Sequence, residues 1–276
     1  MQRLRLAQQM IAESPPTWLL DIALTGSASR GLADADSDIE FNAWGHDLPS
    51  PAERNTWLRT LGATEIALAV EVTDDGTTWD RWRYQDEWVE AGWQTMAALE
   101  SCLWGTLRGE LLDHARMMLA EVVSHAMLLR SHGLIASWQA ALATYPDIVQ
   151  QRLIDSTVER WSSPYTAITR WSVVRRGQFL AVTEELVGDI HGVLRVLFAL
   201  NREWEPDWKW ISALQARLPR KPDHLVERIT ACVSKDAPAD RMRACTRLIL
   251  DALALCPPTP AVAQARANLQ AGLDAN

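Results

Sequence analysis

Two short motifs, separated by a spacer over residues 28–37, most constrain how this chain of 276 residues folds. The first, Leu24-Thr25-Gly26-Ser27, places a glycine and a serine at the end of an apolar strand. The second, Asp38-Ile39-Glu40-Phe41, places two carboxylates two residues apart on the strand that follows. Residues i and i+2 of a strand point to the same face, so the two carboxylates converge while the apolar residues face a core.

Converging carboxylates predict a cation site. Two adjacent carboxylates repel each other unless a positive charge lies between them, and a divalent hard cation such as Mg²⁺ is the simplest solution. The Gly26-Ser27 turn offers backbone N–H groups and a hydroxyl to an anion. A metal site beside an anion site favours nucleotide chemistry.

The whole pattern of apolar strand, Gly-Ser, spacer and acid-apolar-acid resembles the signature of the DNA-polymerase-β-like nucleotidyltransferase superfamily. The spacer is also similar to the usual filling of the family, with Gly31 easing the turn. The Ser-Asp-Ile-Glu-Phe run at residues 37–41 is most similar to the branch that inactivates lincosamide and aminoglycoside antibiotics.

The resemblance implies a role for each motif residue. Asp38 and Glu40 would hold one or two Mg²⁺ ions, and Gly26 and Ser27 would bind the β- and γ-phosphates of a nucleoside triphosphate, with ATP the expected one. The further nucleotide-binding candidates are Arg30 and Ser37. Glu40 stands where the family more often has aspartate, and its longer arm still reaches a metal.

A third carboxylate is expected from a later strand, and two glutamates are candidates. Residues 78–94 are rich in aromatics around a polar turn, which predicts a hairpin. Glu90 lies in the middle of its second strand, where the family places the third acid, and we select it as catalytic acid and metal ligand. Glu71, which precedes an Asp-Asp-Gly loop, is the alternative. Either glutamate can instead be a solvated surface residue.

The composition of the chain limits the classes of binding partner that we expect. The formal net charge is −8 and no basic tract is present, which disfavours nucleic acid and suits a small cationic substrate. No apolar run has the length of a bilayer, and the first ten residues lack the apolar core of a signal peptide. The four cysteines are scattered. We therefore expect a cytoplasmic protein with no membrane partner; the oligomeric state stays open.

The fold class predicted is α+β, with a nucleotidyltransferase-type mixed sheet flanked by helices over residues 1–107 and an all-helical bundle over 108–276. The expected elements of the first part are a helix at 2–13 stopped by Pro15-Pro16, strands at 18–25 and 38–44, a helix from Pro51 capped by Ser50, one or two strands before residue 76, the hairpin, and a helix at 95–107. In the second part, apolar residues at 186, 190, 193 or 194 and 197 form one helical stripe. An Ala-rich helix follows Pro260.

Basic residues of the second part complete the predicted nucleotide site. Residues 195–210 resemble the antibiotic-modifying enzymes, which implies that Arg202 and Lys209 bind phosphate. Arg175 and Arg176 are alternatives, and each of the four can instead be a surface residue of the bundle. The aromatic residues near the third acid belong either to a substrate cleft or to the hairpin core; they are Trp82, Trp88 and Trp93.

These features predict a Mg²⁺-dependent nucleotidyltransferase, in the first instance an adenylyltransferase. It would move an NMP to a hydroxyl group of a small molecule, for which an aminoglycoside or lincosamide antibiotic is the candidate, so that the activity would confer antibiotic resistance. Two alternatives stay open. One is a toxin/antitoxin-type protein that acts on tRNA or protein, and the other is a catalytically inactive regulatory member.

Overall fold

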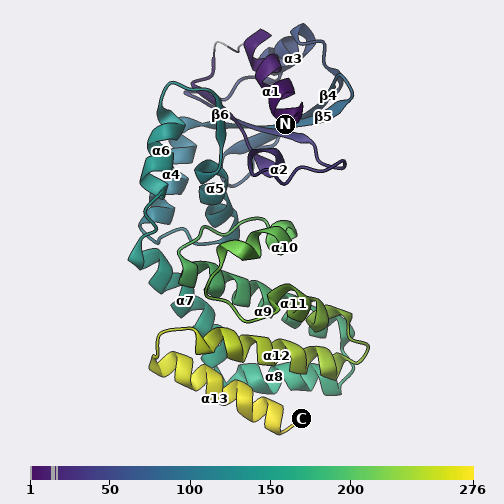
Figure 1. Cartoon of the computed structure of the whole chain (residues 1–276), viewed down its shortest axis with the longest axis vertical. Helices are drawn as coiled ribbons and strands as arrows, with labels where there is room; N and C mark the ends of the chain where they lie inside the picture. The colour runs from purple at the N-terminus through teal and green to yellow at the C-terminus, as the bar shows by residue number, and fades with distance from the viewer. Residues whose placement is uncertain (1, 14–15, 17) are drawn as a thin grey trace. The chain divides into compact units, whose positions relative to one another are not determined.

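The computed structural model describes residues 2–13, 16 and 18–276. It divides into two compact units, Met1–Thr144 and Tyr145–Asn276 (Figure 1). The first unit contains a six-stranded mixed sheet with helices, and the second is built from helices. This arrangement confirms the predicted α+β class, in which a mixed sheet flanked by helices precedes a helical C-terminal half.

The division between the units differs from the predicted one at residue 107. Residues 108–144 belong to the first unit, because β6 (Met127–Arg130) pairs antiparallel with β1 (Asp21–Leu24) at the edge of the sheet. Helices α5 (His114–Ser124) and α6 (Leu134–Leu142) flank this strand along the chain. A four-residue apolar strand between two helices has no periodicity that would distinguish it from a helix.

The sheet has the strand order β3-β4-β5-β2-β1-β6, and it positions the predicted motifs on neighbouring strands. Its central pair, β2 (Ile39–Gly45) and β5 (Glu87–Thr95), is parallel, and the other neighbouring strands are antiparallel. β4 (Thr77–Tyr84) and β5 form the predicted hairpin, and β3 (Thr64–Leu68) pairs with β4. The strands predicted at 18–25 and 38–44 are confirmed as β1 and β2 with slightly shifted ends.

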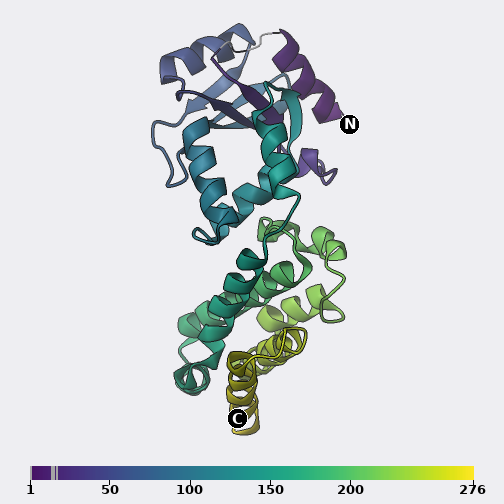
Figure 2. The same cartoon turned by 90° about the vertical axis from the view of Figure 1, so that its left-hand side faces the viewer.

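One face of the sheet is covered by α1 (Gln2–Glu13) and α3 (Pro51–Thr60), which lie on the same side of it in both views (Figures 1 and 2). The core beneath them contains Trp57, whose ring centre lies 6.1 Å from that of Trp82 and 5.7 Å from that of Trp93. Of the three tryptophans near the predicted third acid, two therefore belong to the core. Helix α1 has the predicted bounds; Pro15 of its predicted stop lies outside the described residues.

Local capping sets the starts of two helices as predicted. The Ser50 hydroxyl accepts from the Glu53 backbone N–H at 3.3 Å, and the Glu53 carboxylate accepts from the Ser50 N–H at 2.8 Å, which completes a capping box at α3. Helix α4 (Met96–Leu107) begins after Thr95, whose hydroxyl accepts from the Ala98 N–H at 3.1 Å. In Figure 1, α4, α5 and α6 lie on the side of the sheet opposite α1 and α3.

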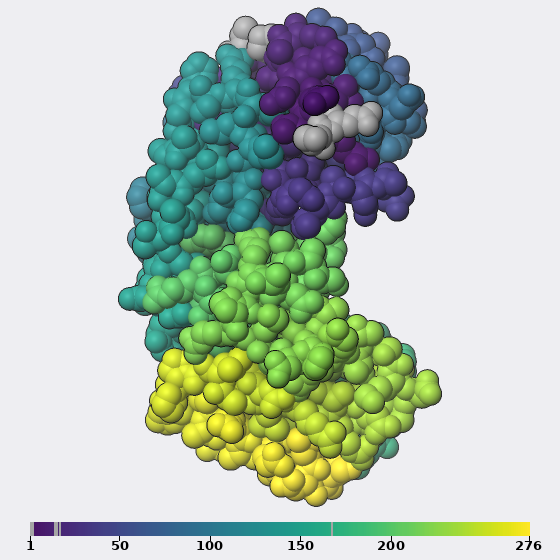
Figure 3. Space-filling model, viewed as in Figure 1, coloured from purple at the N-terminus to yellow at the C-terminus, as the bar shows by residue number. Residues whose placement is uncertain are grey.

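The second unit packs around α9 (Phe179–Asn201), whose predicted apolar stripe is buried. The Ala-rich helix α13 (Pro260–Asp274) lies against this bundle and forms one continuous surface with α12 (Pro238–Ala254) (Figure 3). The other elements are α7 (Asp147–Ser162), α8 (Pro164–Arg175), η1 (Trp208–Trp210), α10 (Ile211–Leu214), η2 (Gln215–Arg217) and α11 (Leu225–Ser234). Across residues 2–13, 16 and 18–276, every helix is too short or too polar to cross a membrane.

Candidate functional site

The Gly-Ser turn and the second acid of the motif meet in the structure. Gly26 begins the short helix α2 (Gly26–Ser29) directly after β1, with φ of +60°. A Cβ on residue 26 would lie only 1.8 Å from Glu40 Oε2, so glycine is what leaves room for this carboxylate at the turn. The Thr25 N–H donates to the Glu40 carbonyl at 2.9 Å and fixes the turn to β2. The longer arm of glutamate is what brings its carboxylate back to Gly26.

The turn itself gives the first testable consequence of this contact. We expect Gly26→Ala to destabilise the first unit by about 1–3 kcal/mol more than Gly31→Ala, because only the former pushes a methyl group into Glu40. Gly31 has a similar φ of +70° and nothing within 4 Å of its Cβ position, so it reports the backbone strain alone. Urea unfolding of the two full-length variants measures the difference. Equal losses in both variants would mean that Glu40 does not need the space above Gly26.

Two of the three predicted acids, Glu40 and Glu90, lie on one face of the sheet. Glu40 and Glu90 are register partners on the parallel strands β2 and β5, so their side chains leave the same face next to each other. Asp38 lies two residues before Glu40, immediately ahead of β2, and is half-buried. Glu71 instead lies in an exposed segment between β3 and β4. The register therefore brings Glu90, and not Glu71, beside Glu40.

The donor chemistry of this face suits Mg²⁺, because it consists of carboxylate oxygens. The Glu90 carboxylate also pairs with Arg81, at 3.5 Å between Oε1 and the guanidinium Nε. In the described part of the chain, no three His, Cys, Asp or Glu side chains are grouped tightly enough to hold a metal ion. Binding of Mg²⁺ by Asp38, Glu40 and Glu90 therefore stays a prediction, and Glu90 already has a cationic partner in Arg81.

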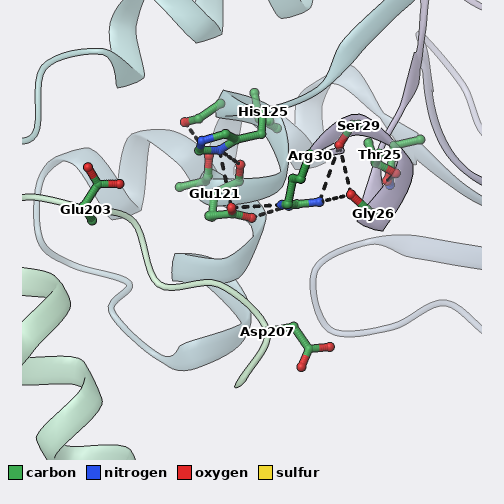
Figure 4. A network of polar contacts seen from close by, with 12 residues as sticks. Thr25, Gly26, Ser29, Arg30, Glu121, His125, Glu203 and Asp207 are labelled. Carbon is green, nitrogen blue, oxygen red and sulfur yellow. Dashed lines mark hydrogen bonds and ion pairs between the residues drawn. The ribbon is translucent and has the colours of Figure 1, made fainter. Parts of the chain in front are cut away.

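Arg30, predicted to bind nucleotide, donates a hydrogen bond to the backbone of the Gly26-Ser27 turn. Its guanidinium makes a two-pronged ion pair with Glu121 of α5, with Nε at 3.0 Å from Oε1, and also donates to the Gly26 carbonyl (Figure 4). The side chains of Arg30 and Glu121 are 7% and 1% exposed. His125 adds to the network, with Nδ1 3.0 Å from the Glu121 carbonyl. A guanidinium bound in this way supports the Gly26-Ser27 turn, and contact of Arg30 with a nucleotide stays a prediction.

The two serines of the motif differ in their surroundings. Ser27 is almost fully buried within α2, where its carbonyl accepts from the Arg30 and Leu32 N–H groups. Ser37 is part of the turn before β2, and its hydroxyl donates to Asp34 Oδ1 at 2.8 Å. This hydrogen bond lowers the pKa of the Asp34 carboxyl. Ser37 therefore shapes the spacer, and its contact with a nucleotide is untested.

The two predicted phosphate-binding residues of the second unit, Arg202 and Lys209, both have partners within that unit. Arg202 ends α9 in the left-handed conformation, donates to the Tyr145 carbonyl at 3.0 Å and pairs with Asp147. Lys209 lies in η1, with Nζ 3.3 Å from Asp207 Oδ2. The alternatives are Arg175, which donates to Asn276, and Arg176, which ends α8. Phosphate binding by any of these residues stays a prediction.

Sequence reasoning missed Glu121 and His125, which support the turn. Glu121 lies in α5 and His125 directly follows that helix, and Glu121 is 91 residues from Arg30. A lone glutamate in an apolar helix gives no signal of its partner, because the pairing depends on the packing of α5 against α2. The sequence feature that could have indicated Glu121 is a charged residue among the apolar positions of a helix, because a buried charge usually has a partner.

The chain is similar to one protein family over part of its length and to solved structures. A family described as "Domain of unknown function (DUF4037)" matches residues 112–211. The chain is similar to the crystal structure of a nucleotidyltransferase-like protein from Exiguobacterium sibiricum, with 12% sequence identity and a TM-score of 0.39, covering 99% of this chain and 89% of that chain. No curated protein matches the chain. A functional assignment therefore depends on the residues and geometry of the site.

Proposed function

We propose that this protein is a nucleotidyltransferase that moves an NMP from an NTP, in the first instance ATP, to a hydroxyl group of a small acceptor. The observation that carries the proposal is the meeting of the Gly26-Ser27 turn with Glu40, which is in turn the register partner of Glu90. An anion-binding turn and adjacent carboxylates are the two parts that transfer of a nucleotide needs.

The residues have the following roles in the proposed reaction. The backbone N–H groups of Gly26 and Ser27 hold the β- and γ-phosphates, while Asp38 and Glu40 are the residues that would hold Mg²⁺. Bound there, the ion would offset the charge of the phosphates. The acceptor oxygen forms a bond to the α-phosphorus, the bond from that phosphorus to the bridging oxygen breaks, and pyrophosphate leaves. Glu90 takes the proton of the hydroxyl.

The charge of the protein favours a cationic acceptor. The net charge is −8, and the site adds carboxylates of its own, so an ammonium-bearing molecule is attracted to it. Aminoglycosides and lincosamides have both amino groups and free hydroxyls, and they are the acceptors that we propose to test first.

The test incubates the full-length protein with Mg²⁺, each of the four α-labelled NTPs, and kanamycin, lincomycin or total tRNA. Label on a drug, lost on adding EDTA and restored by Mg²⁺, supports the proposal. Label on RNA or on the protein supports a toxin-type transferase instead. Absence of transfer with every combination contradicts small-molecule transfer on the tested acceptors and favours the second candidate below.

One observation favours a second candidate, an inactive member that binds NTP without transferring it. The Glu90 carboxylate is engaged by Arg81, so the residue proposed as base already has a cationic partner. Such a protein would bind a labelled NTP in equilibrium dialysis and form no product. Binding and transfer measured on the same preparation separate the two candidates.

The role of Glu90 has a direct test, because the chain provides its own matched control. We expect Glu90→Gln to lower transfer by about 10²-fold, since general base catalysis is lost while the shape of the side chain is kept. Glu71→Gln, which removes a carboxylate in the exposed segment before β4, should leave the rate unchanged. Steady-state rates of both variants measure this. A loss in Glu71→Gln alone would reassign the third acid.

A further inference from the structure

The face of the sheet that has the acids also has an aromatic ring. On β4, Arg81 is the register partner of Glu90, and Trp79 is the register partner of Gly92. Gly92 is in turn the partner of Asn42 on β2. Because side chains two residues apart share a face, Trp79 lies on the acidic face, one pleat along from Glu90.

The indole of Trp79 lies across β5 because residue 92 has no side chain. A Cβ on Gly92 would lie 3.1 Å from both Cζ2 and Cη2 of Trp79, and 2.7 Å from the Asn42 amide nitrogen. The outer edge of the ring and the amide thus meet above this glycine. Trp79 is 39% exposed, whereas Trp82 and Trp93 are buried in the core on the opposite face. The ring is therefore partly exposed on the face of the sheet that has the proposed base.

Planar polar groups border this surface. Glu90 and Arg81 are 34% and 51% exposed and form an ion pair, and Arg81 also lies 4.4 Å from the ring centre of Trp88. A flat apolar ring bordered by a carboxylate, a guanidinium and an amide matches the chemistry of a saccharide. The C–H face of a sugar ring packs on an indole, and its hydroxyls bond to planar polar side chains.

We propose that Trp79, together with Glu90 and Arg81, forms a subsite for a saccharide ring of the acceptor. This inference rests on the proposed transferase function for the identity of the ligand as an acceptor. The sugar stacks on Trp79 and directs a hydroxyl toward Glu90, so that Trp79 selects acceptors by ring shape. Stacking on Trp79 does not require a charged amino group on the acceptor. Uncharged sugars therefore distinguish this contact from the general electrostatic attraction of cations.

The test observes Trp79 without relying on catalysis. The full-length protein is labelled with 5-fluorotryptophan, and the ¹⁹F resonance missing in Trp79→Phe is assigned to this residue. We expect that resonance to shift on adding kanamycin, lincomycin or the uncharged sugar trehalose, and to stay in place with a non-hydrolysable ATP analogue and Mg²⁺. A silent resonance with all three sugars overturns the subsite. A shift with the nucleotide alone also overturns it and assigns the ring to the base.

The two proposals fail separately. A Trp79 shift without any NMP transfer would retain the saccharide subsite and remove the transferase, and transfer to a drug with a silent Trp79 would do the reverse. Where transfer occurs, we expect Trp79→Ala to raise the KM for the acceptor about tenfold and leave the KM for the NTP unchanged. Trp79→Phe should recover most of the affinity. Trp104→Ala, which removes an indole that is 50% exposed on α4, is the matched control.

Discussion

Asp38→Asn and Glu40→Gln should each lower NMP transfer by about 10³-fold and leave the fold intact. Both changes keep the shape of the side chain and remove one negative charge from a pair that would hold a divalent cation. Such an ion stabilises the transition state by several kcal/mol, and each loss of about 1.4 kcal/mol lowers the rate tenfold. Both residues are half-buried near the start of β2 and keep their side-chain size, so neither substitution opens a cavity. Initial rates with saturating NTP and acceptor, together with circular dichroism, measure the effect.

Asp36→Asn is the matched control for this pair. Asp36 is an exposed carboxylate two residues before Asp38 in the same spacer, and its removal changes the net charge by the same amount. We expect its rate to be unchanged, because the effect depends on a specific site and not on the overall field. Wild-type rates in Asp38→Asn or Glu40→Gln would contradict the metal assignment. Equal losses in all three variants would show that the rate depends on the net charge of the protein and not on a specific metal site.

Signals confined to a few neighbouring residues predicted much of the first unit. Ser50 followed by Pro51 identifies the start of α3, and the aromatic residues around the polar turn at Gln85-Asp86 identify the hairpin. The Gly-Ser turn and the acid pair are separated by one short spacer, and the structure joins them at Gly26 and Glu40. Each of these features depends on contacts between residues that are close together in the sequence, so the spacing of residue types is enough to predict it.

Contacts between distant parts of the chain are what the sequence could not provide. Strand β6 exists because it pairs with β1, about a hundred residues earlier, and nothing in its four residues requires a strand. The ring of Trp79 reaches the acidic face because of Gly92 on the next strand, a relation that depends on the register of the hairpin. The ion pair of Arg30 with Glu121 forms because the fold brings α5 to its guanidinium. In each case the role of a residue is set by a partner that only the tertiary fold supplies.

Among the residues whose role depends on a distant partner, Glu121 is the one whose substitution should lower the stability of the fold most. We expect Glu121→Gln to destabilise the β1–α2 region by about 3–5 kcal/mol, because the guanidinium of Arg30 stays buried without its counter-charge. The same change frees Arg30 from the position in which it donates to the Gly26 carbonyl, so the Gly26-Ser27 turn loses its support. Amide hydrogen exchange of peptides from β1 and α2 in the full-length chain measures the local free energy of opening.

The chain contains a surface copy of the same interaction, and the comparison isolates burial as the cause. Arg108 and Glu110 form an equally two-pronged pair, with Nε at 3.0 Å from Oε1 and Nη2 at 2.9 Å from Oε2, but their side chains are 57% and 53% exposed. Glu110→Gln should therefore leave exchange unchanged, since water replaces the lost partner. Replacing both buried charges, as in Arg30→Met with Glu121→Leu, should recover most of the stability but not the transfer rate. Equal effects of Glu121→Gln and Glu110→Gln would show that the buried network does not hold the turn.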